Sequence, residues 1–211
     1  MGRRSAHTPE QLRELIISAA LDIVSDNGLS GVSAREIARK IGYSPGTLYN
    51  LFESLDDLLL HVEARMLDAL DERLSEVPAE THPDLHLKAL IRAYTGFCRQ
   101  NPNLCNLIIQ HGMPRGTQMP AWYLEKLGRI VGRIETGLAP LMSEVPQSSE
   151  ALQRTAREVW AAAHGIIMLS TMEKLASLAD GAPENMTDEF VSTYLAGLRH
   201  FNRSSTGMKR A

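Results

Sequence analysis

The chain has 211 residues, a formal net charge of −3 and only two cysteines, Cys98 and Cys105. This length allows one large or two small domains with a core that needs no covalent cross-links. The cysteines are seven residues apart with Pro102 between them, which fits neither a disulfide framework nor a metal site. No apolar run approaches the ~20 residues of a membrane span, and the N-terminus lacks a secretory signal. We therefore expect a cytoplasmic protein that does not bind membranes.

Helix-start signals open the chain. Thr8 stands at an N-cap position, Pro9 at the first helical position and Gln11 where a capping box needs it, and Gly28 ends this helix. Ser33 and Glu36 form the pattern of a second capping box, before a two-turn helix with a buried stripe. The stripe consists of Ile37, Ala38 and Ile41.

A third helix is predicted to start at Pro45, after Gly42 has stopped the second one. Ser44 is its expected cap, and its inward residues are Leu48, Leu51 and Phe52. The exposed face is left with small and polar residues. Residues 54–57 then cap a long fourth helix that is predicted to reach about Pro78.

The remainder of the chain also follows helical spacing. Breaks are expected at Pro102, Pro140 and Pro146, and Thr187 is the expected cap of the last helix. These signals predict an all-α fold. The expected helices are 84–100, 103–111, 120–138, 149–179 and 187–202, and the expected domains are a head over 1–53, a body over 54–202 and a disordered tail over 203–211.

The second and third helices have the properties of a helix-turn-helix. Small and apolar residues join the two helices, Gly42 permits a tight turn, and the outer face of the second offers hydrogen-bonding groups. Residues 1–52 also carry six Lys and Arg against five acids, whereas the rest carries sixteen against twenty. This mild asymmetry is compatible with a DNA-reading head on an acidic body.

From about Leu15 to Leu67 the sequence resembles the DNA-binding domain of the TetR family of transcriptional regulators. The family pattern is met by Ala19, Gly28, Ser33, Ile37, Ala38, Gly42, Ser44, Thr47, Leu48, Tyr49, Phe52 and Leu58. The resemblance implies that Ser33 and Arg35 touch the DNA backbone. It implies that Tyr49 hydrogen-bonds a phosphate, and that bases or adjacent phosphates are faced by Ser44, Pro45, Gly46, Thr47 and Asn50.

Two positions depart from the family pattern. Family members often carry His where this chain has Leu51 and usually Lys where it has Leu55, and both commonly contact phosphate. Their absence predicts weaker and less salt-dependent DNA binding than is usual in the family. Arg3 and Arg4 could reach the duplex as a flexible arm.

The C-terminal part resembles the domain type named for its Trp–His–Gly signature, here Trp160, His164 and Gly165. In the family this part binds a small molecule and forms a homodimer. A mixture of large apolar groups with a few polar ones is typical of small-molecule sites. The expected ligand-binding residues are Tyr94, Phe97, Trp122, Tyr123, Trp160, His164 and Met168, although helical spacing of this kind also serves an ordinary core. Gly165 suggests a close crossing of another helix or of a ligand.

Taken with the family resemblance, these features predict a dimeric repressor that binds a pseudo-palindromic operator and is released by an apolar or aromatic effector. No cofactor is expected. The alternatives are an all-α enzyme and a DNA-organising protein without a ligand. His82 and His86 are spaced as a metal pair, but Pro83 marks a helix start between them, and no acid–base constellation is evident. We therefore expect neither a metal site nor catalysis.

Overall fold

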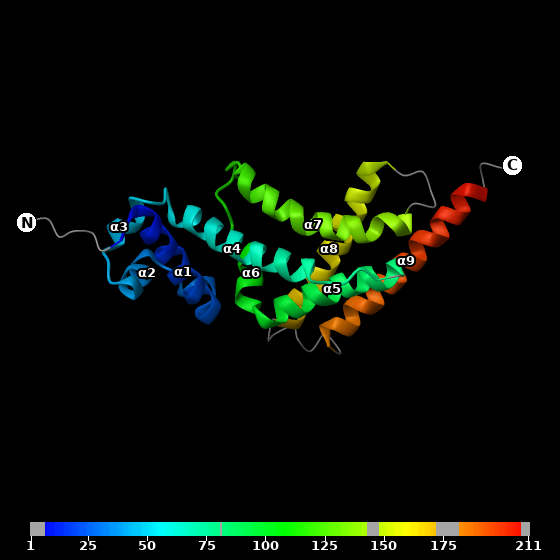
Figure 1. Cartoon of the computed structure of the whole chain (residues 1–211), viewed down its shortest axis with the longest axis horizontal. Coiled ribbons are helices and arrows are strands. Elements are labelled where there is room, and N and C mark those ends of the chain that lie inside the picture. The colour runs from blue at the N-terminus through cyan, green and yellow to red at the C-terminus, as the bar shows by residue number, and fades with distance from the viewer. Residues whose placement is uncertain (1–6, 81, 143–147, 172–181, 208–211) are drawn as a thin grey trace, which may run out of the picture. The chain divides into compact units, whose positions relative to one another are not determined.

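The protein is helical throughout the part that the computed structural model describes, which covers residues 7–80, 82–142, 148–171 and 182–207 (Figure 1). No strand occurs in these residues, and the expected all-α fold is confirmed. The elements are α1 (Pro9–Asn27), the 3-10 turn η1 (Leu29–Gly31), α2 (Ala34–Ile41), α3 (Pro45–Tyr49), α4 (Leu55–Ser75), α5 (Pro83–Gln100), α6 (Pro102–Gln110), α7 (Ala121–Met142), α8 (Ser149–Thr171) and α9 (Pro183–Gly207).

Local capping chemistry explains where the first two helices begin. The Thr8 side chain accepts from the backbone N–H of Gln11, and the Gln11 side chain accepts in return from the backbone N–H of Thr8. At α2, the Ser33 hydroxyl accepts from the backbone N–H of Glu36 at 3.1 Å. The reciprocal half of this second box is missing, because the Glu36 carboxylate pairs with Arg39 instead. Each cap satisfies helix-end donors that would otherwise need water.

Two later helices differ from the sequence prediction. α7 continues through Pro140 to Met142, and α9 begins at Pro183 rather than after Thr187. The Thr187 hydroxyl accordingly donates to the carbonyls of Pro183 and Glu184 inside the helix, so it does not cap. α9 extends to Gly207 into the expected tail, while 208–211 and the expected continuation of α8 over 172–179 lie outside the described residues.

The chain forms two compact units, each of which is assembled from separate stretches. Unit 1 comprises residues 1–69 and 101–126, and unit 2 comprises residues 70–100 and 127–211. Of the three points at which the chain passes between the units, two fall inside helices, in α4 and in α7, and the third lies between α5 and α6. The expected domain boundary between residues 53 and 54 remains a prediction.

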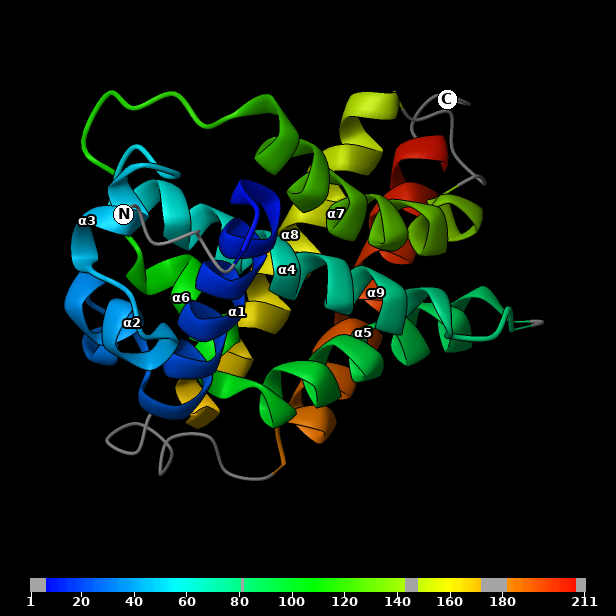
Figure 2. The same ribbon diagram turned by 60° about the vertical axis from the view of Figure 1, so that its left-hand side comes forward.

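Unit 1 contains α1, α2, α3, the first part of α4, α6 and the first turns of α7. α1 packs on α2 and on α6, and α2 packs on α3 (Figure 2). Fully buried side chains fill its centre, which explains why such short helices hold together. Among them are Ile16, Ala20, Val24, Ile37, Leu58 and Val62.

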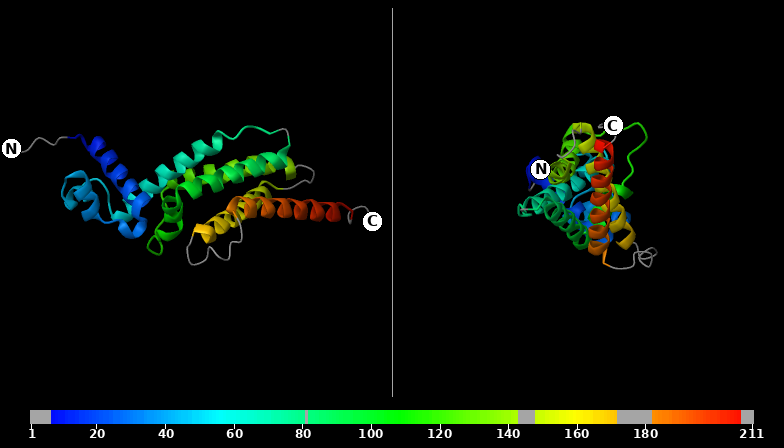
Figure 3. Two further views of the ribbon diagram at one scale, coloured as in Figure 1. Left: turned by 90° about the horizontal axis from the view of Figure 1, so that it is seen from below. Right: turned by 90° about the vertical axis from the view of Figure 1, so that its right-hand side faces the viewer.

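Unit 2 consists of α5, α8 and α9 with the later parts of α4 and α7. α9 packs on both α5 and α8 (Figure 3). Its core is formed by Leu87, Ile91, Ile134, Leu138, Met142, Ala156, Val159, Ala163, Val191 and Leu195. Three ion pairs also join α5 to α9, between Arg92 and Asp188, Arg99 and Glu184, and Arg199 and Asp84. None of the described helices is long and apolar enough to cross a bilayer.

Candidate nucleic-acid interface

The turn between α2 and α3 depends on Gly42. Its backbone is left-handed, with φ of 75° and ψ of 29°, a conformation that costs other residues about 1–2 kcal/mol. The next amide, that of Tyr43, donates to the Ala38 carbonyl at 2.9 Å and closes the end of α2. Leu48 and Phe52 are then buried, at 2 % and 3 % exposure, and anchor the inner face of α3.

The outer face of α3 is open to solvent. Tyr49 is 55 % exposed, although it is a large aromatic residue. Thr47 is half-buried, and the remaining residues that the resemblance implied for DNA contact are exposed. They are Ser44, Pro45, Gly46 and Asn50 on this face, with Ser33 and Arg35 at the start of α2. Their contacts with DNA remain a prediction.

Ser44 occupies the N-cap position of α3 without capping through its side chain. Its hydroxyl lies 3.0 Å from the Thr47 hydroxyl, and its backbone carbonyl accepts from the Thr47 amide. The amide donors at the start of α3 therefore receive no side-chain oxygen from Ser44. A Cβ on Gly46 would meet only the Ser44 hydroxyl, at 3.9 Å, so packing within the protein does not require a glycine there.

A buried polar cluster on α4 was not predicted from the sequence. Glu63 is 2 % exposed and accepts hydrogen bonds from the Tyr123 hydroxyl and from Nδ1 of His111, the latter at 2.7 Å. The bond to Glu63 raises the pKa of His111, and burial together with Glu63 raises the pKa of Tyr123. Nε2 of His111 lies 3.4 Å from a carboxylate oxygen of Asp56, without hydrogen-bond alignment. The sequence signal that could have revealed this cluster is Glu63 itself, an acidic residue among the apolar positions that α4 buries.

α6 is attached to α1 as well as to α4. The Asn103 side chain donates to the Ser25 carbonyl at 2.8 Å, near the start of α6. His111, just after the end of α6, binds Glu63 as described. These two attachments explain why α6 belongs to the same compact unit as the helix-turn-helix.

Three of the expected ligand-binding residues come together in unit 2. Nδ1 of His164 is hydrogen-bonded to the Tyr94 hydroxyl, and the Trp160 ring stacks on His164 with centroids 5.6 Å apart. His164 is 5 % exposed, and its burial lowers its pKa. Its Nε2 has no hydrogen-bond partner among the described residues. A buried polar atom of this kind is costly unless water or a ligand meets it.

The other expected ligand residues are distributed differently. Phe97 and Met168 are half-buried in unit 2, whereas Trp122 and Tyr123 belong to unit 1. There the Trp122 ring stacks on His61, and the Tyr123 hydroxyl is bonded to Glu63. That these seven residues bind a ligand remains a prediction.

No close crossing was found at Gly165. A Cβ there would meet no described atom within 4 Å, and the residue is exposed on α8. The expected close crossing of another helix of the chain therefore does not occur among the described residues.

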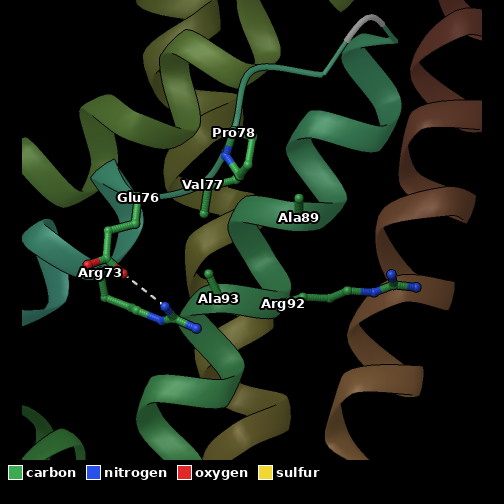
Figure 4. Close-up of a pocket in the computed structure, with 7 residues that line it drawn as sticks. All are labelled: Arg73, Glu76, Val77, Pro78, Ala89, Arg92 and Ala93. Carbon is green, nitrogen blue, oxygen red and sulfur yellow. Dashed lines mark hydrogen bonds and ion pairs between the residues drawn. The ribbon is translucent and has the colours of Figure 1, made fainter.

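A hollow of about 400 Å³ lies on unit 2 between the end of α4 and α5 (Figure 4). Arg73 at its edge pairs with Glu76 at 2.9 Å, and the Arg92 guanidinium points away from it and binds Asp188. None of the expected ligand residues lines it. Because both arginines have carboxylate partners, the hollow is not an evident anion site.

The described residues contain no group of three or more His, Cys, Asp and Glu side chains placed to hold a metal ion. His82 lies just before α5, and its carbonyl accepts from the amides of Leu85 and His86. Cys98 and Cys105 are both buried, and they are not joined in a disulfide.

The fold and the exposed outer face of α3 define a helix-turn-helix transcriptional regulator with a helical C-terminal domain. Comparison with known families agrees with this class. Residues 16–62 match the model of the bacterial regulatory proteins of the tetR family, and residues 87–194 match that of the tetracyclin repressor-like C-terminal domain. The chain belongs to the TetR family of transcriptional regulators. The likeness to the Trp–His–Gly type remains a prediction.

Relatives of known sequence are regulators of the same kind. An uncharacterised helix-turn-helix regulator of Mycobacterium tuberculosis is 26 % identical over 167 residues, which are 79 % of this chain and 73 % of that protein. The repressor KstR of Rhodococcus jostii is 24 % identical over 156 residues, 74 % of this chain and 72 % of the relative.

Solved structures share the fold at lower identity. FadR of Bacillus subtilis, in complex with stearoyl-CoA, has a TM-score of 0.67 at 14 % identity and covers 87 % of this chain and 98 % of its own. BioQ with its double-stranded DNA operator has a TM-score of 0.62 at 16 % identity, and the match covers 88 % of this chain and 98 % of BioQ.

Proposed function

We propose that the chain is a homodimeric repressor that binds a pseudo-palindromic operator through α3 of each copy and is released by a small apolar or aromatic effector. The observation that carries the proposal is the exposed polar face of α3 above the buried anchor of Leu48 and Phe52. One short helix reads too few base pairs for useful specificity. Two copies about one helical turn apart on a palindrome overcome this limit.

Repression is supported by relatives rather than by the geometry. KstR carries the name of a repressor, and BioQ was crystallised on an operator duplex. We accordingly assign the DNA-reading head to residues 1–53 and the effector and dimer functions to residues 54–202. A reporter gene behind the selected operator should be less active when the protein is present.

Dimerisation is supported by apolar residues that the chain itself leaves uncovered. Leu169 on α8 is 43 % exposed, and Phe190, Tyr194 and Leu198 on α9 are only partly buried. Val191 and Leu195, in contrast, are buried in the core of unit 2 and are unavailable to a partner. The proposed interface is therefore narrower than the whole apolar stripe of α9.

The effector proposal rests on His164. Burial lowers the pKa of His164 and so favours its neutral ring, which contacts the Trp160 and Tyr94 rings and whose Nε2 has no hydrogen-bond partner among the described residues. FadR, which shares the fold, binds stearoyl-CoA, so a ligand with a long apolar part is the first probe. Binding releases DNA if the effector favours a spacing of the two α3 helices that the operator does not fit.

In vitro selection of bound duplexes from fragmented genomic DNA, at two salt concentrations, tests the DNA part of the proposal. We expect a short pseudo-palindromic motif. The double variant Thr47→Ala/Asn50→Ala should lose the enrichment, and the control Ser192→Ala, at an exposed position of α9, should keep it. Enrichment without a motif would favour a DNA-organising protein, and no enrichment at either salt would count against DNA recognition by α3.

The effector part is tested by thermal melting with stearoyl-CoA, stearate and small aromatic acids. A ligand that binds the folded protein raises Tm with its concentration. We expect at least one probe to raise Tm and to lower operator binding, and we expect His164→Leu to weaken both effects. A ligand that raises Tm without changing DNA affinity would contradict release by an effector.

A further inference from the structure

The recognition helix is held at its C-terminal end by a residue from α1. α3 has five residues, too few for a helix to be stable alone. Nη1 of Arg13 donates to the Leu51 carbonyl at 2.6 Å, and the guanidinium lies 4.3 Å from the centroid of the Phe52 ring. A cation at a helix C-terminus also interacts favourably with the helix dipole. Arg13 therefore fixes the segment that follows α3 by a hydrogen bond and a cation–π contact.

The second amino group of Arg13 binds α4. Nη2 lies 2.6 Å from Nε2 of His61. Because a guanidinium can only donate, Nε2 must accept, so His61 is neutral and carries its proton on Nδ1. Burial and the charge of Arg13 lower the pKa of His61, which agrees with this assignment, while Asp57 and Glu14 act in the opposite direction. One guanidinium thus joins α1, α4 and the end of α3.

His61 is in turn placed by the first turn of α7. Its ring stacks on Trp122 with centroids 4.7 Å apart and planes 9° from parallel, and the Phe52 ring meets it edge-on at 5.7 Å. Trp122 also packs edge-on against Tyr123, whose hydroxyl is bonded to buried Glu63. Trp122 therefore lies between the His61 ring and a tyrosine that is itself bonded to buried Glu63. All of these residues belong to unit 1.

We propose that Arg13 is a positioning residue for the recognition helix, that Trp122 sets its placement through His61, and that the first turn of α7 thereby controls DNA affinity. The inference rests on the proposed operator binding through α3. Arg13 is half-buried and lies outside the residues assigned to DNA, so it acts on DNA through Leu51 and Phe52. A shift of the Trp122 ring would move the His61 acceptor away from Arg13 and loosen the end of α3.

The test compares Arg13→Met with the matched control Arg65→Met. Arg65 on α4 forms an ion pair with Glu14 on α1, so it joins the same two helices without touching α3. Operator affinity is measured by fluorescence anisotropy on the selected duplex, and Tm is measured on the same samples. Losing a hydrogen bond from a charged group amounts to about a tenfold change in an equilibrium constant. We expect Arg13→Met to weaken binding about tenfold and Arg65→Met to weaken it less than twofold.

Trp122→Leu and the double variant test the route through α7. We expect Trp122→Leu alone to weaken binding several-fold, and the double variant Arg13→Met/Trp122→Leu to bind as Arg13→Met does, because both changes act on one contact. Arg13→Lys should not restore affinity, because an ammonium group lacks the planar fork that reaches the Leu51 carbonyl and His61 together. If Arg13→Met fails to fold, His61→Phe keeps the ring stack, removes the acceptor and should also weaken binding.

The outcomes separate the inference from the proposed function. If the unmodified protein binds no duplex, the proposed function fails and the inference fails with it. If it binds an operator and Arg13→Met binds as Arg65→Met does, the inference alone is overturned. Additive losses in the double variant would also overturn it, since independent effects would mean that Trp122 does not act through Arg13.

Discussion

Glu63 shows at the residue scale how a single side chain organises unit 1. It is a carboxylate at 2 % exposure in the middle of α4, and burial at such a site is tolerated only with strong partners. His111 and Tyr123, one after α6 and one on α7, supply them. The cost of leaving any one of these groups unpaired explains why two segments remote in sequence return to the same turn of α4.

Glu63→Gln should destabilise the protein in a pH-dependent way. The pKa of His111 is raised by Glu63, so the pair stabilises the fold fully below pH ~6.5 and loses this effect as pH rises through the raised pKa. We expect a loss of about 1–3 kcal/mol at pH 6 and a smaller loss at pH 8.5. Urea unfolding of both proteins across this range measures the difference.

The control for this prediction is Glu76→Gln, which removes an exposed acid paired with Arg73. Its effect should be within about 0.5 kcal/mol and flat over the same range. The burial of His61 and His164 lowers their pKa values and reduces stability below pH ~6.5, but equally in all three proteins. A loss for Glu63→Gln that does not change with pH would show that the charge on His111 is not involved.

At the element scale, one of the three glycines of α7 differs from the other two in what surrounds it. A Cβ on Gly137 would lie 3.0 Å from Cδ1 of Leu90 and 3.4 Å from Cδ1 of Leu87, so this residue lets α5 approach. A Cβ on Gly128 or Gly132 would meet no described atom within 4 Å. Among these three glycines, Gly137 alone lies against the leucine side chains of α5.

Gly137→Leu should therefore be destabilising, and Gly132→Leu should not. Overpacking of a filled interface costs about 1–3 kcal/mol, whereas replacing an open helical glycine gains up to ~1 kcal/mol through helix propensity. Chemical denaturation of the two variants beside the unmodified protein measures both effects. Equal changes of the same sign would show that α5 does not pack closely on Gly137.

The same elements show what the sequence alone could and could not predict. The starts of α1 and α2 and the turn at Gly42 were predicted correctly, because caps and left-handed glycines act within a few residues. α7 passes through Pro140 because Leu138 and Met142 pack in the core of unit 2, and α9 starts before Thr187 because it packs on α5 and α8. In both helices this packing outweighs the local stop signals. The grouping of Trp122 with His61 depends on contacts across 61 positions of the chain, which no local pattern encodes.

At the scale of the whole molecule, the departure at Leu55 bears on salt dependence. Leu55 is half-buried at the start of α4, where the family usually carries Lys. Each phosphate neutralised by a protein cation steepens the fall of log K with log salt by about 0.9. Leu55→Lys in a dimer should tighten operator binding at low salt and steepen this slope by up to about 2. Binding measured from 50 to 300 mM salt checks both, and an unchanged slope would place residue 55 away from phosphate.

The proposed dimer makes a prediction about Leu169. This residue is 43 % exposed on α8, and a glutamate there would place a charge in an apolar interface. We expect Leu169→Glu to raise the dimer dissociation constant at least tenfold, as measured by light scattering over a dilution series. Affinity for a full palindrome should fall in parallel, because a monomer holds only one half-site, while the weak affinity for an isolated half-site should stay the same.

Leu85→Glu is the matched control, since Leu85 is 51 % exposed on α5 and outside the proposed interface. Equal dissociation constants for the two variants would exclude the α8 face as the dimer contact, and a monomeric unmodified protein would exclude the dimer itself.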